Sequence, residues 1–266
     1  MFSLSIPRLR RRSALAAGTV CVALVAACSD NATAPAGAGP MSPPSLPPGA
    51  NSGMFSGTPP VVDGIMTPGE YDGAATISFR AMLPPNAQGS GTPVTVYITH
   101  DKTYLYLATV FDRKSAFHPA DAVIFEFDKD NDGLREDGDE TLGVAAYGPT
   151  APMPFPGMDM HRRTVNNVSS NAFDTSVGGT NNSISAWGAV GTTGVFEIRQ
   201  ELNSTDDPRD LSIDFSNGAK TVGIMTQVQL EADPIGSGQF VNTFKPSFWT
   251  YCKLTLGKKV TSVSCP

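Results

Sequence analysis

The residues best suited to bind a cation lie in a run of carboxylates at 128–139, directly after a short apolar segment. Oxygen ligands at alternate positions allow a loop to wrap a hard cation such as Ca²⁺, which takes six to eight of them. Counted from the first aspartate, positions 1, 3, 5, 9 and 12 carry carboxylates, and position 6 is a glycine at which such a loop turns sharply. The spacing predicts a calcium loop, with a solvated acidic turn as the alternative. The predicted ligands are Asp128, Asp130, Asp132, Glu136 and Asp139.

Strand-like segments separated by Asp, Asn, Gly and Pro would hold this loop in place. The segment before it, 122–127, reads as a strand, so an EF-hand pair of helices is not expected. The sequence predicts an all-β domain, a two-sheet antiparallel β-sandwich of the jelly-roll kind. Two polar stretches, 148–160 and 164–185, are expected to be loops over one rim. The expected strands are 76–81, 94–99, 104–111, 122–127, 142–147, 195–202, 221–231 and 249–256.

Residues 1–27 read as an export leader. Four arginines between positions 8 and 12 precede an apolar stretch that is too short to remain as a membrane-spanning helix. The stretch ends in Val25-Ala26-Ala27-Cys28, which resembles the lipobox of bacterial lipoprotein precursors. The resemblance implies cleavage before Cys28, lipid attachment to that residue, and a place in the cell envelope, with the outer membrane of a Gram-negative-type bacterium favoured. Ordinary secretory cleavage is the alternative.

Residues 28–57 are rich in Ala, Pro, Gly and Ser and are expected to form a disordered tether to a single domain at 58–266. Without the four leader arginines, 15 of the 19 basic residues remain against 25 acidic ones, a net charge of about −10. This charge argues against nucleic acid and anionic membrane surfaces as partners. Contact with a membrane is expected only through the lipid anchor.

Two cysteines, Cys252 and Cys265, lie beyond the leader and the lipobox. In an oxidising compartment they are expected to form a disulfide that holds the C-terminal tail to the last predicted strand. Two free thiols are the alternative.

Several short motifs, in order, resemble family 9-type carbohydrate-binding modules, a β-sandwich group related to DOMON domains. The opening of the family is matched by Val62-Asp63-Gly64 and Gly69-Glu70-Tyr71. A strand that ends in an Asp turn and leads to Tyr104-Leu105-Tyr106-Leu107 resembles the family's hairpin, and Phe111-Asp112 and 123–132 resemble the next two landmarks. The likeness covers 61–143 well and the remainder only in outline.

The resemblance implies a calcium-stabilised sandwich that binds a saccharide between aromatic side chains. The C–H face of a sugar ring suits the face of an aromatic ring. The chain has two tryptophans, Trp187 and Trp249, and both are candidates for this role. The alternative for each is a place in the core or at a sheet edge.

Other classes of function have weaker support in the sequence. Some DOMON relatives hold b-type haem, and the candidate axial ligands would be His100, His118, His161, Met158 and Met160. No Cys-x-x-Cys-His, Gly-x-Ser-x-Gly or His-Glu-x-x-His motif is present, so the sequence predicts a binding domain and not an enzyme. A structural or adhesive surface domain, with calcium holding one loop rigid, is the main alternative.

Overall fold

The computed structural model describes residues 52–53, 58–81, 92–101, 103–112, 121–146, 155–165, 168–202, 204, 210–213, 215, 218–231, 238–242, 251–257 and 261–265. The expected leader (1–27), Cys28, most of the expected tether (28–57), His118 and Trp249 lie outside these residues. Within the described part, no helix is long and apolar enough to cross a membrane.

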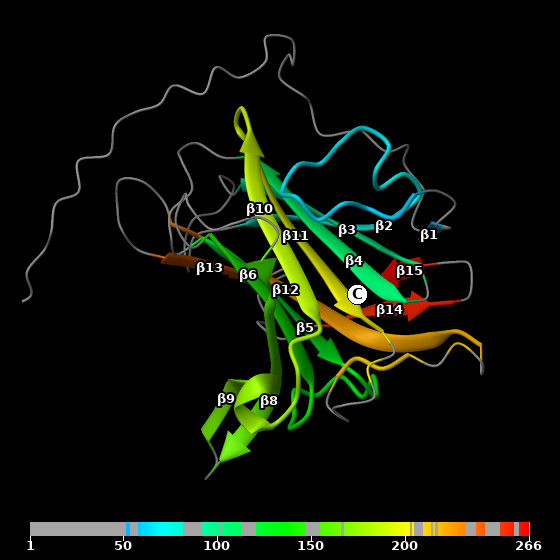
Figure 1. Ribbon diagram of the computed structural model, residues 1–266, viewed down its shortest axis with the longest axis vertical. Helices are drawn as coiled ribbons and strands as arrows, with labels where there is room; N and C mark the ends of the chain where they lie inside the picture. The colour runs from blue at the N-terminus through cyan, green and yellow to red at the C-terminus, as the bar shows by residue number, and fades with distance from the viewer. Residues whose placement is uncertain are drawn as a thin grey trace, which may run out of the picture. The chain divides into compact units, whose positions relative to one another are not determined.

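The described strands form two antiparallel sheets, which confirms the predicted two-sheet sandwich (Figure 1). Sheet A has the strand order β1-β15-β14-β12-β5-β6-β8-β9, with β13 paired to β12 beside that path. Its strands are β1 (Ser52–Gly53), β5 (Ala122–Asp128), β6 (Glu140–Ala145), β8 (Met158–Val165), β9 (Val168–Phe173), β12 (Lys220–Glu231), β13 (Gly238–Asn242), β14 (Cys252–Leu256) and β15 (Thr261–Ser264).

Sheet B has the order β2-β3-β4-β11-β10-β7. Its strands are β2 (Ala75–Ala81), β3 (Thr92–His100), β4 (Tyr104–Asp112), β7 (Phe155–Pro156), β10 (Ser183–Val190) and β11 (Thr193–Glu201). A short 3-10 turn, η1 (Asp174–Val177), follows β9.

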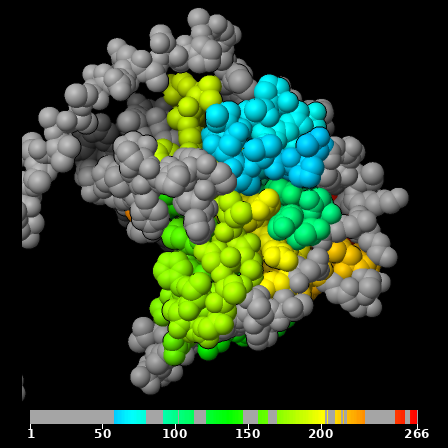
Figure 2. Space-filling view, in the orientation of Figure 1, coloured from blue at the N-terminus to red at the C-terminus, as the bar shows by residue number. Residues whose placement is uncertain are grey.

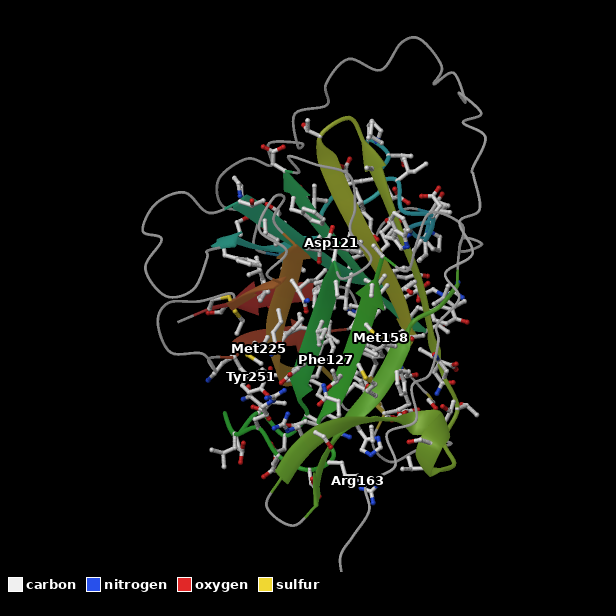
Figure 3. The ribbon with its side chains drawn as sticks, turned by 90° about the vertical axis from the view of Figure 1, so that its left-hand side faces the viewer. Asp121, Phe127, Met158, Arg163, Met225 and Tyr251 are labelled. Atoms are coloured by element: carbon white, nitrogen blue, oxygen red, sulfur yellow. A yellow bond between two sulfur atoms is a disulfide. The ribbon has the colours of Figure 1, made fainter. Side chains whose placement is uncertain are left out.

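The main core lies between the two sheets. Phe125 and Leu142 of sheet A and Leu107 of sheet B are fully buried. Phe111 of β4 and Phe196 of β11 stack with ring centroids 5.5 Å apart. Figure 3 shows Asp121 just before β5 and Phe127 near the end of that strand, whose residues Val123, Phe125 and Phe127 belong to the core.

Each of the eight strands expected from the sequence overlaps an observed strand, and residues 147, 249 and 250 of two of them lie outside the described residues. The expectation for the two polar stretches is wrong, because β8, β9 and the first residues of β10 lie within or overlap them. These strands were missed because their inward side chains are charged or polar, so the apolar alternation that marks a strand is absent. Asp159 and His161 of β8, for example, are 1% and 3% exposed.

The N-terminal cover (residues 58–74) packs on the outer face of sheet B, as the cyan surface in Figure 2 shows. Tyr71 of the cover is buried against Tyr97 and Tyr106 of the sheet. The carboxylate of Glu197 on β11 fixes the cover. It accepts hydrogen bonds from the backbone N–H of Asp63 (3.0 Å) and Gly64 (2.8 Å) and from the Tyr71 hydroxyl (3.2 Å).

Gly64 lets the cover approach sheet B closely. Its φ is +79°, and a Cβ atom at this position would lie 2.4 Å from the backbone carbonyl carbon of Trp187. Only glycine fits such a contact without a shift of the backbone. The Val62-Asp63-Gly64 motif therefore has a structural role, because its backbone N–H groups bind Glu197 while its glycine contacts β10.

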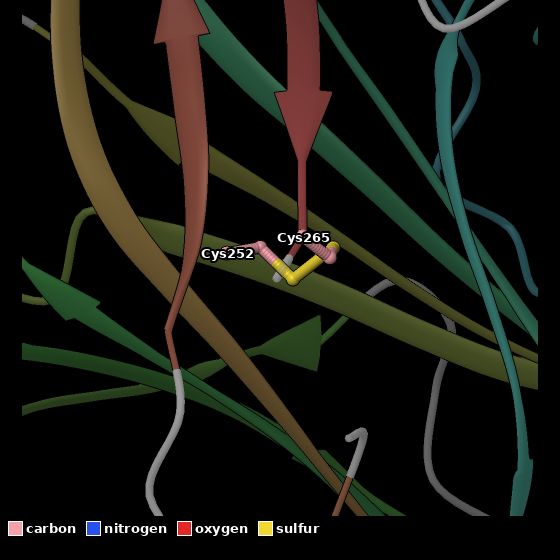
Figure 4. Close-up of a disulfide and its surroundings, with 2 residues drawn as sticks. All are labelled: Cys252 and Cys265. Carbon is pink, nitrogen blue, oxygen red and sulfur yellow. A yellow bond between two sulfur atoms is a disulfide. The ribbon is translucent and has the colours of Figure 1, made fainter. Parts of the chain in front are cut away.

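Cys252 at the start of β14 and Cys265 just after β15 form a disulfide, with their Cα atoms 4.2 Å apart (Figure 4). The two strands are also paired in register, with Lys253 opposite Ser264. The bridge holds the final strand to sheet A at the end of the described chain.

We expect removal of this bridge to destabilise the domain. The 13-residue separation predicts a loss of about 3 kcal/mol in the free energy of unfolding, or about 6 to 12 °C in Tm. The measurement is thermal unfolding of the Cys252→Ala/Cys265→Ala variant. As a control, a reducing agent should lower the wild-type Tm by a similar amount and leave the variant unchanged. An unchanged wild-type Tm would mean that the thiols are free.

Glu197 gives a second prediction, on the pH dependence of stability. Burial raises the pKa of its carboxyl from 4.5 to about 7 in the folded state. Between these values the folded chain holds a proton that the unfolded chain has lost, so the free energy of unfolding falls as the pH rises from about 5 to 8. The shift corresponds to a contribution on the order of 3 kcal/mol. Urea unfolding across this range should show a shallower fall for Glu197→Gln, and parallel profiles would contradict the assignment.

Candidate functional site

The predicted calcium loop is the turn between β5 and β6. One carboxylate oxygen each from Asp128, Asp130 and Asp132 lies within 4.8 Å of the other two. The turn is shaped by Asn131 and Gly133, whose φ angles are +59° and +85°. The arrangement suits a hard cation, because three carboxylates at alternate positions converge on one side of a tight turn.

Hydrogen bonds inside the loop hold these carboxylates in place. The two oxygens of Asp128 accept from the backbone N–H of Asp132 (3.2 Å) and Gly133 (2.8 Å). Asp132 in turn accepts from Leu134 N–H (2.7 Å). Asp128 is 1% exposed, and burial raises the pKa of its carboxyl, while the Gly133 N–H opposes this rise. Hydrogen bonds from the backbone N–H groups of the loop therefore hold its carboxylates in position.

The other two predicted ligands lie at the edge of this group. Glu136 is exposed, and the carboxylates of Asp132 and Asp130 raise its pKa, so it faces the same negative field. Asp139 is buried and accepts a hydrogen bond from Glu136 N–H (2.9 Å). Burial raises the pKa of Asp139 to about 6, and the nearby Asp128 adds to the rise. The structure thus brings three of the five predicted residues into one cluster and places two beside it.

A second group of carboxylates, which the sequence did not predict as a site, lies in the interior where β6, β8, η1 and the residues around 182 and 210 meet. It is called the buried carboxylate pocket and is formed by Glu140, Asp159, Asp174 and Asp210. Each side chain belongs to a residue that is at most 2% exposed, and one oxygen of each lies within 4.8 Å of the other three.

The pocket carries a high density of negative charge with little solvent. Burial raises the pKa of Glu140 well above its usual value, and the charges of Asp159, Asp174 and Asp210 raise it further. Burial likewise raises the pKa of Asp159 to about 7. The neighbouring Lys129 has a pKa lowered by burial, while the carboxylate of Glu140 opposes that change.

A wide groove crosses the edge of the sandwich where β2 of sheet B meets β14 and β15 of sheet A. Its volume is about 890 Å³. Six hydroxyl side chains line it, together with the Lys253 ammonium group and the Asn131 amide. The hydroxyls belong to Thr76, Ser78, Thr221, Thr255, Ser262 and Ser264. Ile77, Val263 and Cys265 provide apolar surface. Such a lining can donate and accept many hydrogen bonds, as a polyhydroxylated ligand requires.

The groove and the calcium loop share a residue. Asn131, between two of the clustered aspartates, is half-buried and lines the groove. A cation that orders the loop would therefore also fix one wall of the groove.

Trp187, the predicted sugar platform, lies on β10 opposite Phe196 of β11 and packs against the main core. It is half-buried, and its indole Nε1 is buried. In the order β2-β3-β4-β11-β10-β7, three strands lie between β10, which carries Trp187, and β2, which lines the groove. Trp187 and the groove therefore belong to different ends of sheet B. Trp249 lies outside the described residues.

The haem candidates have other surroundings. His100 is buried and stacks on Phe215, with ring centroids 5.1 Å apart. His161 lies against the buried carboxylate pocket, with its Nδ1 atom 2.6 Å from Asp174. Met160 is 7% exposed and Met158 is half-buried on the same strand. Among the described residues these side chains contact protein neighbours at separate positions along β3 and β8.

Comparison with known proteins gives similarity at the level of structure. No protein-family model and no curated protein sequence matches the chain. The structure is similar to a family 9 carbohydrate-binding module from Caldicellulosiruptor kristjanssonii in complex with cellotriose (16% identity, TM-score 0.43, 73% of this chain and 85% of that chain). It is also similar to a family 9 module from that organism in complex with glucose (17% identity, TM-score 0.46, 73% and 87%).

A third similar structure is a protein from Bacteroides uniformis proposed to bind carbohydrate (12% identity, TM-score 0.45, 69% of this chain and 87% of that chain).

The buried carboxylate pocket could not be predicted from the sequence, because its four residues are far apart in the chain. Glu140 stands at the end of the acidic run, whereas Asp159 and Asp174 lie in stretches expected to be loops. The one usable signal was Met158-Asp159-Met160-His161, which alternates like a strand with polar residues on its inner face.

Proposed function

We propose that this chain is an exported, non-catalytic carbohydrate-binding domain, stabilised by calcium and anchored to the cell envelope through a lipid on Cys28. The hydroxyl-lined groove beside β2, β14 and β15 is the observation that supports saccharide binding. Its volume of about 890 Å³ falls within the range of small-molecule sites. The anchoring part is supported by the lipobox-like sequence that ends at Cys28.

The groove chemistry suits a neutral, hydroxyl-rich ligand. Hydroxyl and amide groups supply both donors and acceptors, and Lys253 supplies charged donors. Thr221 and Thr255 are held side by side on β12 and β14, with their Oγ1 atoms 2.9 Å apart. Hydroxyls fixed on rigid strands lose little freedom when a ligand binds.

Calcium in the loop of residues 128–139 is supported by the convergence of Asp128, Asp130 and Asp132. These residues would supply the first ligands, and Glu136 and Asp139, whose carboxyls feel the negative charge of the cluster, would be the further ligands. The ion would neutralise the loop and rigidify Asn131 at the groove wall.

One prediction concerns the calcium loop of residues 128–139. At a calcium concentration about 100 times Kd, binding stabilises the folded state by about 2.7 kcal/mol, or about 5 to 10 °C in Tm. Asp130→Ala should reduce the calcium-dependent rise in Tm by that amount. Asp137→Ala is the matched control, because it removes one exposed carboxylate from the same loop outside the cluster. Equal behaviour of the two variants would mean that the loop is a solvated turn.

Another prediction concerns the hydroxyl-lined groove. A glycan array, with glucose and cellotriose among its probes, should show retention of the protein on one class of glycan. Thr255→Val and Lys253→Ala should each weaken binding about 3- to 10-fold, since each removes a hydrogen-bonding group worth about 1 kcal/mol. Their Tm should stay close to wild type. Thr192→Val, at an exposed threonine in the β10–β11 turn, is the matched control.

The same array tests the alternative positions and functions. Loss of retention in Trp187→Ala at an unchanged Tm, with the groove variants unaffected, would move the saccharide site to Trp187. A lower Tm in that variant would mark Trp187 as a core residue. No retention of the wild-type protein on any glycan would favour a structural or adhesive surface domain.

A further inference from the structure

The buried carboxylate pocket has an arrangement that packing alone does not require. Its four carboxylates come from β6, β8, η1 and the segment at 210, which are separate in sequence and meet only in the folded chain. The ionised groups would repel one another strongly in an interior with little water. Some positive charge or shared protons must therefore accompany them.

Each carboxylate in the pocket has one oxygen held by a donor. Glu140 Oε1 accepts from Thr141 N–H (3.0 Å), and Asp159 Oδ2 accepts from Asn182 N–H (2.6 Å). Asp210 Oδ2 accepts from the Asn182 side-chain amide (2.9 Å), and Asp174 Oδ1 contacts His161 Nδ1 (2.6 Å).

Among the described residues, no hydrogen-bond donor reaches the second oxygen of each carboxylate, although this oxygen is buried. These four atoms are Glu140 Oε2, Asp159 Oδ1, Asp174 Oδ2 and Asp210 Oδ1. Buried polar atoms are almost always satisfied, and a set of four unsatisfied acceptors in one place points to an absent electron-pair acceptor. Donors that fix the outer oxygens and leave the others free are the usual support around metal ligands.

The charges around the pocket leave room for a divalent ion. The four carboxylates carry a charge of −4 when ionised, and Lys129 interacts electrostatically with Glu140 and Asp210. His161 adds one positive charge only when protonated. Counted over the part of the chain that the structure describes, the fully ionised pocket thus lacks two to three positive charges.

The ligand atoms favour calcium over other divalent ions. All four are carboxylate oxygens, which suit hard cations and not those that prefer sulfur or imidazole. Two oxygens on opposite sides of a calcium ion are about 5 Å apart, and the pocket oxygens lie within 4.8 Å of one another. Magnesium keeps several water molecules and seldom takes four carboxylates in a closed site.

We propose that Glu140, Asp159, Asp174 and Asp210 form a closed calcium site that is distinct from the loop of residues 128–139. The ion would join β6, β8, η1 and the segment at 210. The proposal does not depend on saccharide binding or on an ion in the loop, because it rests on different side chains.

The test is the calcium content of the full chain after dialysis against calcium and then against metal-free buffer, measured by elemental analysis. We expect Glu140→Gln to hold one calcium ion fewer than the wild-type chain. With the loop of residues 128–139 also occupied, the wild-type chain holds two ions and Asp130→Ala holds one. Asp210→Asn is a second variant with nearly unchanged shape, in case Glu140→Gln does not fold. Magnesium in place of calcium should not fill the site that Glu140→Gln removes.

Thermal unfolding separates a metal site from a merely structural one. Without metal, Glu140→Gln should melt at or above the wild-type temperature, because it relieves repulsion among like charges. With calcium, its Tm should rise less than that of wild type. Content that is unchanged in both Glu140→Gln and Asp210→Asn would overturn the proposal and indicate carboxyl groups that share protons. A single ion lost only in Asp130→Ala would overturn it while leaving the loop site intact.

Discussion

Carboxylates that are buried together repel one another unless positive charge or bound protons neutralise them, and this constraint acts at the buried carboxylate pocket. Glu140, Asp159, Asp174 and Asp210 are buried together. Strand pairing in sheet A joins β6 to β8, and η1 and the segment at 210 add the other two carboxylates. The geometry of β8, β9 and η1 therefore depends on what neutralises the pocket. Sheet packing elsewhere relies on apolar contacts such as Phe111 with Phe196, which impose no such condition.

The same residue type serves three purposes in this chain. In the β5–β6 loop, the exposed Asp130 and Asp132 gather around a turn with the buried Asp128. In the interior, carboxylates form a pocket. Elsewhere a single carboxylate organises the backbone: Glu197 binds the N-terminal cover, and Asp101 accepts from Thr103 N–H, Tyr104 N–H and the Tyr106 hydroxyl at the β3–β4 turn. The motifs that resemble family 9 modules include the partners of these last two residues, so their spacing reflects backbone organisation.

Features that depend on residues close together in the sequence could be predicted from it. Strands with an apolar inner face, such as β4, β5 and β12, were predictable because alternation and β-branched content coincide there. The clustering of Asp128, Asp130 and Asp132 was predictable because their spacing lies within one turn. The buried carboxylate pocket and the groove were not, since each combines side chains from segments that only the sheet pairing brings together. Strand β8 was missed for a different reason, because its inner face is polar and lacks the apolar alternation of a typical strand.

The pairing of β1 with β15 has a mechanical consequence. In the described N-terminal part of the chain, Ser52 and Gly53 pair with β15, opposite Ser262 and Thr261. A pull on the chain from its N-terminal side would load this two-residue ladder first and peel it one bond at a time. The force would next reach the N-terminal cover, where the hydrogen bonds to Glu197 bear it together. β15 itself would stay attached, since the covalent link at Cys265 carries tension that hydrogen bonds cannot.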